Sequence, residues 1–269
     1  MIKIVLHCLP TELDQVMWII DQLKRSSRFI DPKNFILDFT LNISNDDIDW
    51  NKSQLSKEYC IKKFNSLFKK SPFINENKIS YKQTGCNTVR RNAIRKQDNT
   101  THIIYLDTDL IFPETILYYV EQAVSEINSK YYIITPQIFQ LWDSSWDIIS
   151  HPDYRNLPRE NKQWLTNPYQ VFEHEPTDIK LLKSSHIKFG GGWFNIFSKN
   201  LLELIDIPDS LGHYGLDDTF VAEAANILKN KKYDIQQFIL NDIIVKEDRV
   251  YRTHSMEEFF IRNNNQNNM

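Results

Sequence analysis

The fold is decided by the stretch THIIYLDTDLIF, residues 101–112. A short apolar strand leads into Asp107 and Asp109, and the chain then returns to apolar residues. Because side chains alternate along an extended strand, the single intervening residue puts both carboxylates on one face. Two carboxylates at the end of a hydrophobic strand are costly unless a charge compensates them, and hard oxygen ligands suit Mg²⁺ or Mn²⁺. The pattern predicts a divalent-cation site; the alternative is that the acids only cap the segment that begins at Pro113.

Composition excludes several other classes of protein. With 269 residues, 41% of them hydrophobic, the chain can bury a substantial core. A net charge of −3 gives no basic footprint, which argues against nucleic-acid binding. The three cysteines lack CxxC spacing, as expected for reduced thiols without a zinc site. No signal peptide or run of transmembrane length is recognisable, so we expect a cytoplasmic protein; a peripheral membrane contact stays open.

Strand and helix patterns alternate through the first half of the chain. Strands are expected at residues 3–9, 34–41, 78–81 and 101–106, and helices over residues 11–23, 54–69 and 89–95. This order predicts the α/β class, with a mostly parallel central sheet flanked by helices on both faces. Because such sheets bind ligands at the carboxyl ends of their strands, the ends of the first two strands and Asp107–Asp109 should meet at one edge.

The second half is less regular. A helix is expected from Pro113 to about Ile127 and a strand over 131–135, followed by an aromatic, Pro- and Asn-rich stretch over 142–175. A loop region of that length is usually functional or disordered, and its aromatic content disfavours disorder. The Asn-rich tail is expected to fray.

A second group of candidate residues follows that loop. Gly190–Gly192 permit close backbone approach or a tight bend. Asp217 and Asp218 precede a helical apolar pattern, where one acid would serve as a cap, so the second acid suggests a general base. His254, near the end of the chain, is a candidate to complete the cation site.

Four segments, taken in order, carry a resemblance to a known family. They are Thr88–Ile94, Leu106–Asp109, Gly191–Asp218 and Arg252–Ser255. Their order and spacing resemble the GT-A glycosyltransferases, most of all family 2 and the β-galactosyltransferase type, and the ordered set is more specific than any one motif. The resemblance implies the GT-A, Rossmann-like form of the α/β fold, with a loop-rich acceptor region.

The resemblance also implies an organisation and an activity. Residues 1–260 would form a single catalytic domain, with a nucleotide-binding half (1–112), an acceptor-binding half (113–260) and a disordered tail (261–269). The enzyme would need Mn²⁺ or Mg²⁺ and would move a hexose or N-acetylhexosamine from a nucleotide-sugar donor, expected to be a UDP-sugar. The acceptor would be a hydroxyl of a glycan or glycolipid, and the anomeric centre would be inverted.

The matched motifs imply most of the residue roles, and the ends of the first two strands add Pro10, Thr11 and Asn42, where the sequence departs from that of the family. The catalytic base would be Asp218. The metal ligands would be Asp107, Asp109 and His254. Donor-binding residues would be Pro10, Thr11, Asn42, Arg91, Asp107, Thr108, Gly191 and Gly192. Acceptor-binding residues would be Asp217, Trp193, Phe194 and Tyr214, although Asp217 stands where the family usually has Glu.

Two other classes of function stay open. A nucleotidyltransferase or metal-dependent phosphohydrolase can also end a parallel strand in two aspartates, often with two metals and further carboxylates. A non-catalytic carbohydrate-binding protein would not need the aspartate strand, the acid pair and the histidine together.

Overall fold

The computed structural model describes residues 1–44, 55–69, 71–140, 176, 179–185, 187, 194–215 and 217–247. In this part of the chain the strands are β1 (Ile2–Cys8), β2 (Phe35–Asn42), β3 (Ile74–Ser80), β4 (His102–Leu106), β5 (Leu110–Ile111), β6 (Tyr131–Gln140), β7 (Leu181–Ser184), β8 (Phe194–Ser198) and β9 (Ile235–Glu247). The α-helices are α1 (Leu13–Ser26), α3 (Lys57–Phe68), α4 (Cys86–Arg95), α5 (Ile116–Glu126), α7 (Lys199–Ile205) and α8 (Asp217–Asn230).

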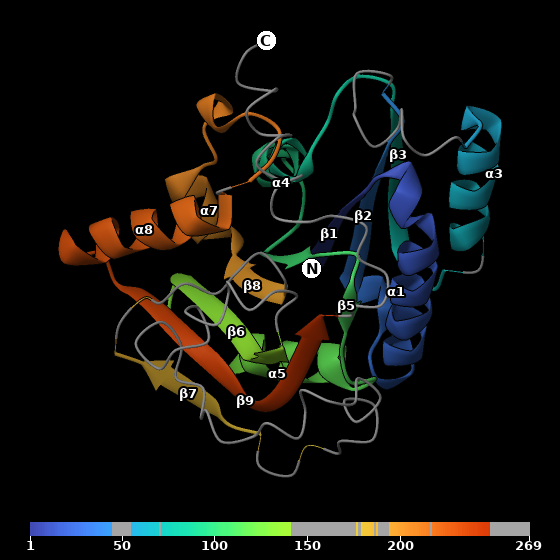
Figure 1. Cartoon of the computed structure of the whole chain (residues 1–269). Helices are drawn as coiled ribbons and strands as arrows, with labels where there is room; N and C mark the ends of the chain where they lie inside the picture. Colours follow the sequence, from blue (N-terminus) through green and yellow to red (C-terminus); the bar gives the residue numbers. More distant parts are fainter. Residues whose placement is uncertain are drawn as a thin grey trace.

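All nine of these strands belong to one sheet (Figure 1). The main path runs β3-β2-β1-β4-β8-β6-β9-β5, and β7 pairs with β9. Strands β1 to β4 are mutually parallel, β8 is antiparallel to both β4 and β6, and β9 is parallel to β6. Six strands therefore point the same way, and only β5, β7 and β8 oppose them. The predicted α/β class with a mostly parallel, helix-flanked sheet is confirmed.

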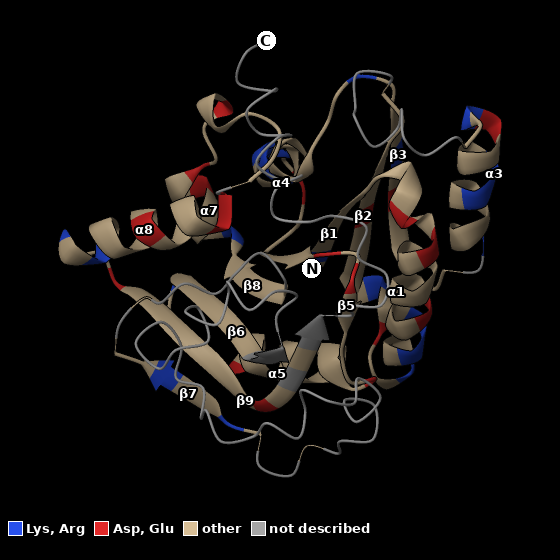
Figure 2. Cartoon of the chain, viewed as in Figure 1, with Lys and Arg blue, Asp and Glu red and all other residues tan. Residues whose placement is uncertain are grey.

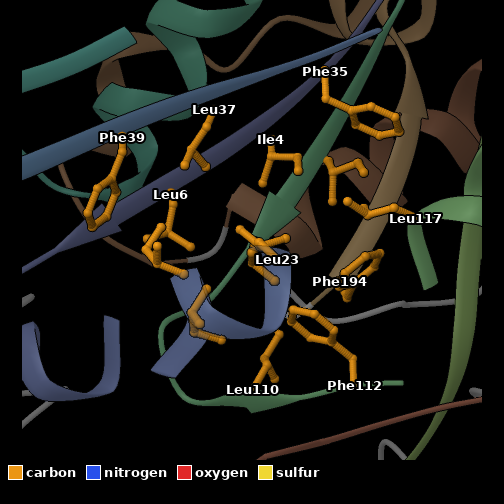
Figure 3. Close-up of a cluster of buried hydrophobic side chains, with 14 of the residues drawn as sticks. Ile4, Leu6, Leu23, Phe35, Leu37, Phe39, Leu110, Phe112, Leu117 and Phe194 are labelled. Atoms are coloured by element: carbon orange, nitrogen blue, oxygen red, sulfur yellow. The ribbon is translucent and has the colours of Figure 1, made fainter. Parts of the chain in front are cut away.

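Each face of the sheet has its own hydrophobic core. One cluster packs α1, α3 and α5 against one face; Figure 3 shows Leu23 of α1 and Leu117 of α5 beside side chains of β1 and β2. The other cluster packs α4, α7 and α8 against the opposite face. Figure 2 shows the strands mostly uncharged and many charged residues on α1 and α3. This is the two-sided burial that a parallel sheet requires.

The predicted elements of the first half are present with shifted ends. The apolar positions of the expected first helix, Val16, Ile19, Ile20 and Leu23, are all buried in α1. Helix α1 begins at Leu13, two residues later than predicted, because Thr11 lies in the 3-10 turn η1 (Pro10–Glu12). In this turn Glu12 accepts the Leu9 backbone N–H at 2.8 Å. β3 begins four residues earlier than predicted, at Ile74. Strands β7, β8 and β9 and helix α7 were not predicted.

Parallel pairing brings the candidate strand ends to one edge. Cys8 at the end of β1 lies beside Leu41 of β2, and Leu6 lies beside Leu106 at the end of β4. Asp107 therefore follows β4 at the same edge as Asn42, which ends β2. The sheet thus supplies the common edge that the ordering of elements predicted.

No helix among the described residues is both long and apolar enough to cross a membrane. The stretch 142–175 and the tail 261–269, for which a loop region and disorder were predicted, lie outside the described residues.

Candidate active site

Arg90, on α4, joins the two acidic segments. Its Nη2 donates to Asp107 Oδ1 at 3.0 Å, and its Nη1 donates to Asp217 Oδ2 at 2.7 Å. Arg90 is 4% exposed and Asp217 is 2% exposed, so the second pair is buried. The guanidinium lies over the Tyr105 ring, 4.5 Å from its centroid. A buried guanidinium is tolerated only when its charge is paired, and here two carboxylates pair it.

Helix α4 holds Arg90 in place through its apolar face. Val89, Ala93 and Ile94 pack into the cluster on this side of the sheet. Arg90 follows Val89 on the helix, so it lies at the edge of this apolar face. From there its side chain contacts Asp107, the residue after β4.

The amino end of α4 holds the loop that precedes α8. Gly85, at the N-cap, lies so close to this loop that a Cβ there would be 2.1 Å from the His213 carbonyl oxygen. The Asn87 backbone N–H donates to that same carbonyl at 3.0 Å. The Asn87 side chain donates to the carbonyls of Leu211 at 3.2 Å and Gly215 at 3.0 Å. The loop that leads into Asp217 and Asp218 is therefore fixed to α4 through backbone groups.

Arg91 makes a different set of contacts from Arg90. Its Nε donates to the Ile207 carbonyl at 2.7 Å, and its Nη2 donates to the Pro208 carbonyl at 2.8 Å. Its Nε also lies 3.1 Å from an oxygen of Asp209, whose side chain is 76% exposed. Arg91, predicted to lie near a nucleotide, thus binds the loop between α7 and α8, and the neighbouring Arg90 contacts the aspartates.

The Asp107 carboxyl lies among other acids. Burial raises its pKa to about 7; Arg90 opposes this rise, and the charges of Asp109, Asp217 and Asp218 add to it. The Asp107 side chain is 37% exposed, so solvent moderates the effect. Among the described residues, Asp109, Asp217 and Asp218 therefore disfavour a charged Asp107 carboxylate, and Arg90 favours it.

Asp218 begins α8 beside this group. Its Oδ1 accepts the backbone N–H of Thr219 at 2.7 Å. Burial raises the pKa of Asp218 to about 6, and the charge of Asp217 adds to the rise. A carboxyl whose pKa lies near neutrality can gain and lose a proton under ordinary conditions.

The donor set at the end of β4 fits a divalent cation. Asp107 and Asp109 offer hard carboxylate oxygens near the charges of Asp217 and Asp218. No group of three or more His, Cys, Asp or Glu side chains suited to a metal occurs within the described ranges. Magnesium is often held by one or two carboxylates together with substrate phosphates, so a pair of aspartates meets that requirement. His254, the predicted third ligand, lies outside the described residues.

The other predicted donor-binding residues lie at the same edge. Pro10 and Thr11 follow β1, and the buried Thr11 hydroxyl has no hydrogen-bond partner within the described part of the chain. Asn42 is fully buried and accepts the Ser44 backbone N–H at 3.0 Å. Thr108 is buried between the two aspartates. Gly191 and Gly192 lie outside the described residues.

The predicted acceptor-binding residues that the structure describes have different surroundings. Phe194 is 1% exposed and its ring packs on Phe112 at 5.7 Å, so it belongs to the hydrophobic core rather than to an acceptor surface. Asp217 faces Arg90 in the interior. Tyr214 is partly buried, with its ring against His7 at 5.6 Å. Trp193 lies outside the described residues.

Three residues of this site escaped the sequence analysis: Gly85, Asn87 and Arg90. The signal for Arg90 was present in the basic helix before the aspartate strand, but two adjacent arginines competed for the role. Gly85 is one of only six glycines and stands immediately before that helix, which is a usable sign of close backbone approach. Nothing in the sequence marks Asn87.

Comparison with known proteins gives likeness in structure alone. No family model matches this chain, and no curated protein sequence matches it. Residues 1–349 of S. aureus TarS superpose with a TM-score of 0.51 at 13% identity, over 97% of this chain and 62% of that one. The same protein in complex with UDP-GlcNAc gives a TM-score of 0.50 at 12% identity, over 97% and 64%. GalNAc-T7 with UDP, GalNAc and Mn²⁺ gives 0.56 at 13% identity, over 92% and 43%.

These similarities bear on the fold. The chain spans about three fifths of the TarS 1–349 structure that it matches. Near-complete coverage of this chain, together with the sheet order and the helices on both faces, matches the predicted architecture. The chain therefore has the fold of the GT-A glycosyltransferases.

Proposed function

We propose that this chain is a metal-dependent glycosyltransferase that moves a sugar from a UDP-sugar to a hydroxyl of a glycan or glycolipid. The observation that carries the proposal is the Arg90 bridge between Asp107 and Asp217. It joins an aspartate strand and an acid pair, 110 positions apart from 107 to 217, at one sheet edge. The shared fold supports it, since TarS has been solved with UDP and with UDP-GlcNAc and GalNAc-T7 with UDP, GalNAc and Mn²⁺.

On this proposal the end of β4 receives the donor. Asp107 and Asp109 would hold Mn²⁺ or Mg²⁺, with His254 as a further ligand. The bound cation supplies neutralisation of the negative charge that develops on the departing diphosphate. The turn at Pro10 and Thr11 and the end of β2 lie along the same edge, where a nucleoside would be oriented.

Asp218 is the proposed general base. It would accept the proton of the attacking acceptor hydroxyl, a contribution of typically 10²–10⁴-fold to the rate. Its raised pKa suits a group that must be ionised before the reaction and protonated after it. A single base with in-line attack opposite the leaving group gives inversion at the anomeric carbon.

On this proposal the two halves of the chain bind different substrates. Residues 1–112 would bind the nucleotide, and residues 113–260 would bind the acceptor within the same domain. The donor sugar would be a hexose or an N-acetylhexosamine.

The first experiment identifies the donor without any acceptor. UDP, GDP, CMP and a panel of UDP-sugars are screened for thermal stabilisation with Mn²⁺ and again with EDTA. A ligand that binds only the folded state at about 100 times its Kd stabilises it by about 2.7 kcal/mol. We expect UDP and one UDP-sugar to raise the melting temperature with Mn²⁺ and not with EDTA. Equal stabilisation in EDTA would contradict the metal requirement.

The second experiment assigns roles to two acids. Asp218→Asn should lower sugar release from the UDP-sugar by about 10²–10⁴-fold while keeping Mn²⁺-dependent UDP binding. Asp109→Ala should weaken that binding itself. Asp21→Asn is the matched control, because its side chain is 52% exposed in the second half of α1, ten residues beyond Thr11. Near-normal turnover in Asp218→Asn would overturn the assignment.

Product analysis decides between this proposal and its rivals. Release of UDP with sugar transfer, or with free sugar when water is the acceptor, indicates a glycosyltransferase. Release of pyrophosphate or a nucleoside monophosphate indicates a nucleotidyltransferase or phosphohydrolase. Binding of sugars with no metal-dependent nucleotide binding indicates a carbohydrate-binding protein.

A further inference from the structure

We propose that Arg90 is a positioning residue, which sets the acid pair at the start of α8 at a fixed distance from the aspartates that follow β4. This inference rests on the proposed function, since it assigns to Arg90 the alignment of the donor side of the site with the base. Arg90 itself need touch neither substrate.

The guanidinium is suited to this role by its shape. Arg90 uses two different nitrogens of one rigid planar group, one for Asp107 at 3.0 Å and the other for Asp217 at 2.7 Å. The Tyr105 ring, 4.5 Å away, restricts the tilt of that plane. Tyr105 lies in β4 only two residues before Asp107. The ring that restricts the Arg90 guanidinium therefore belongs to the strand that leads into Asp107. A lysine can pair with two carboxylates, but its ammonium group lacks the planar fork that fixes their orientation relative to each other.

Burial stiffens the half of the bridge that joins Arg90 to Asp217. Asp217 and Arg90 are nearly inaccessible to solvent, and a charge-assisted hydrogen bond in such surroundings is strong and directional. Asp217 and Asp218 are consecutive in the first turn of α8, so a shift of one carboxylate moves the other. The bridge therefore reaches the proposed base without contacting it directly.

The Asn87 contacts complete the alignment from the other side. Asn87 and Arg90 both project from α4, and between them they bind the chain at 211–215 and at 217. The backbone N–H and the side-chain amide of Asn87 bind carbonyls of the loop, and Arg90 binds Asp217 at the start of the helix. Of these two residues, Arg90 also contacts Asp107, which directly follows β4, so its side chain relates the two acidic segments to each other.

A buried cation elsewhere in the sheet provides the matched control. Lys3 is fully buried in β1, and its Nζ lies 2.5 Å from Asp98 and 3.5 Å from Glu76. It likewise pairs two carboxylates, but at the amino end of the parallel strands, opposite the proposed site. Lys3→Met should cost stability as Arg90→Met does, with no effect on catalysis by the protein that remains folded.

The first test needs no ligand. Asp107→Asn, Asp217→Asn and the double variant are made in the wild-type chain and in Arg90→Lys, and unfolding by urea is measured. If the two aspartates acted independently, the change in the unfolding equilibrium constant of the double variant would equal the product of the two single changes. In the wild-type background we expect the measured change to differ from that product by about tenfold. With Arg90→Lys the difference should fall below about threefold. Independent effects in the wild-type background would overturn the inference, whatever the function of the protein.

The second test measures positioning in the reaction. Arg90→Lys should lower kcat for the UDP-sugar by about 10²-fold, because a misplacement of about 1 Å has that effect, while KM changes by less than about threefold. If Arg90→Lys instead behaves like Lys3→Met, with a lower melting temperature and wild-type kcat, the role is structural and the inference is wrong. If no UDP-sugar is turned over by the wild type, the proposed function fails, and the urea measurements still decide whether the bridge couples the two segments.

Discussion

Adding a single methyl group at Gly85 should dislodge the loop that carries the acid pair. The Gly85 backbone, at φ −106° and ψ −178°, is extended and open to any residue, so the available space alone decides the outcome. A Cβ there would lie 2.1 Å from the His213 carbonyl oxygen and 2.6 Å from its carbon. Unstrained carbon–oxygen contacts are about 3.3 Å or longer, so the two backbones must separate by roughly 1 Å.

That separation has two costs. Overpacking of a tight contact typically destabilises by about 1–3 kcal/mol. Losing the 3.0 Å bond from the Asn87 backbone N–H to the His213 carbonyl leaves polar groups unsatisfied, at about 1–3 kcal/mol more. Gly85→Ala should therefore destabilise the fold by about 2–6 kcal/mol in total. For a chain of this size that corresponds to a fall of roughly 5–15 °C in the melting temperature.

Thermal and urea unfolding followed by circular dichroism measure this loss. Cys86→Ala, at the next position, is the control: it removes an atom instead of adding one, and its loss should be smaller. Below the melting range, Gly85→Ala should also turn over the UDP-sugar more slowly, since Asp217 and Asp218 follow the displaced loop. A Gly85→Ala protein that melts within about 1 °C of wild type would refute the steric reasoning.

Three further outcomes are expected. Asn87→Ala removes the side-chain donor to two loop carbonyls and should destabilise by about 2–4 kcal/mol, measured by urea unfolding. Burial lowers the pKa of His102 to about 4, below the value near 6.5 of an unfolded chain, so the unfolded state takes up the proton first and stability falls from pH 6.5 towards pH 4. His102→Gln should reduce the loss of folding stability between pH 7 and pH 4.5 by about 2–3 kcal/mol, measured from the urea midpoints at the two pH values. An unchanged pH dependence of stability would exclude His102 as the cause. Arg95→Ala should shift the melting temperature by no more than about 2 °C, because the Arg95 and Asp206 side chains are 43% and 41% exposed; a larger loss in a thermal melt would show that this surface pair matters.

The first half of the fold was predictable because its burial pattern is regular. Strands β1, β2 and β4 are nearly continuous apolar runs, as expected for strands covered on both faces. β3 is an edge strand whose first residues, Ile74 to Asn77, are mostly exposed, so its sequence carries little of that signal. Its start was therefore predicted four residues late.

The second half was less predictable for local reasons. β9 contains Asn241 and Asp242 in mid-strand, where Asp242 has φ 64° and the pairing with β6 shifts register. Asn and Asp normally indicate a turn, so the sequence at 241–242 predicts the end of a strand. The structure shows that β9 continues beyond them. β8 is only five residues long and follows a cluster of glycines.

The site was predictable only in its acidic part. Asp107 and Asp109 were recognisable because they follow an apolar strand, and Asp218 because it precedes an apolar helical pattern. Arg90 and Arg91 are adjacent and of one residue type, and successive helix positions lie about 100° apart around the axis. Which of the two faces the aspartates depends on how α4 docks, and a single sequence does not specify that orientation.

The place of β8 in the sheet has a consequence for the nascent chain. β4 pairs with β8 through Leu106 and Phe194, which are 88 positions apart. At a synthesis rate of about 5–20 residues per second, the edge of β4 that pairs with β8 stays unpaired for roughly 4–18 s, until β8 has been synthesised. An unpaired apolar edge is a template for association between chains. Variants that slow elongation between these two strands should therefore lower the yield of soluble protein, even where the finished molecule is unchanged.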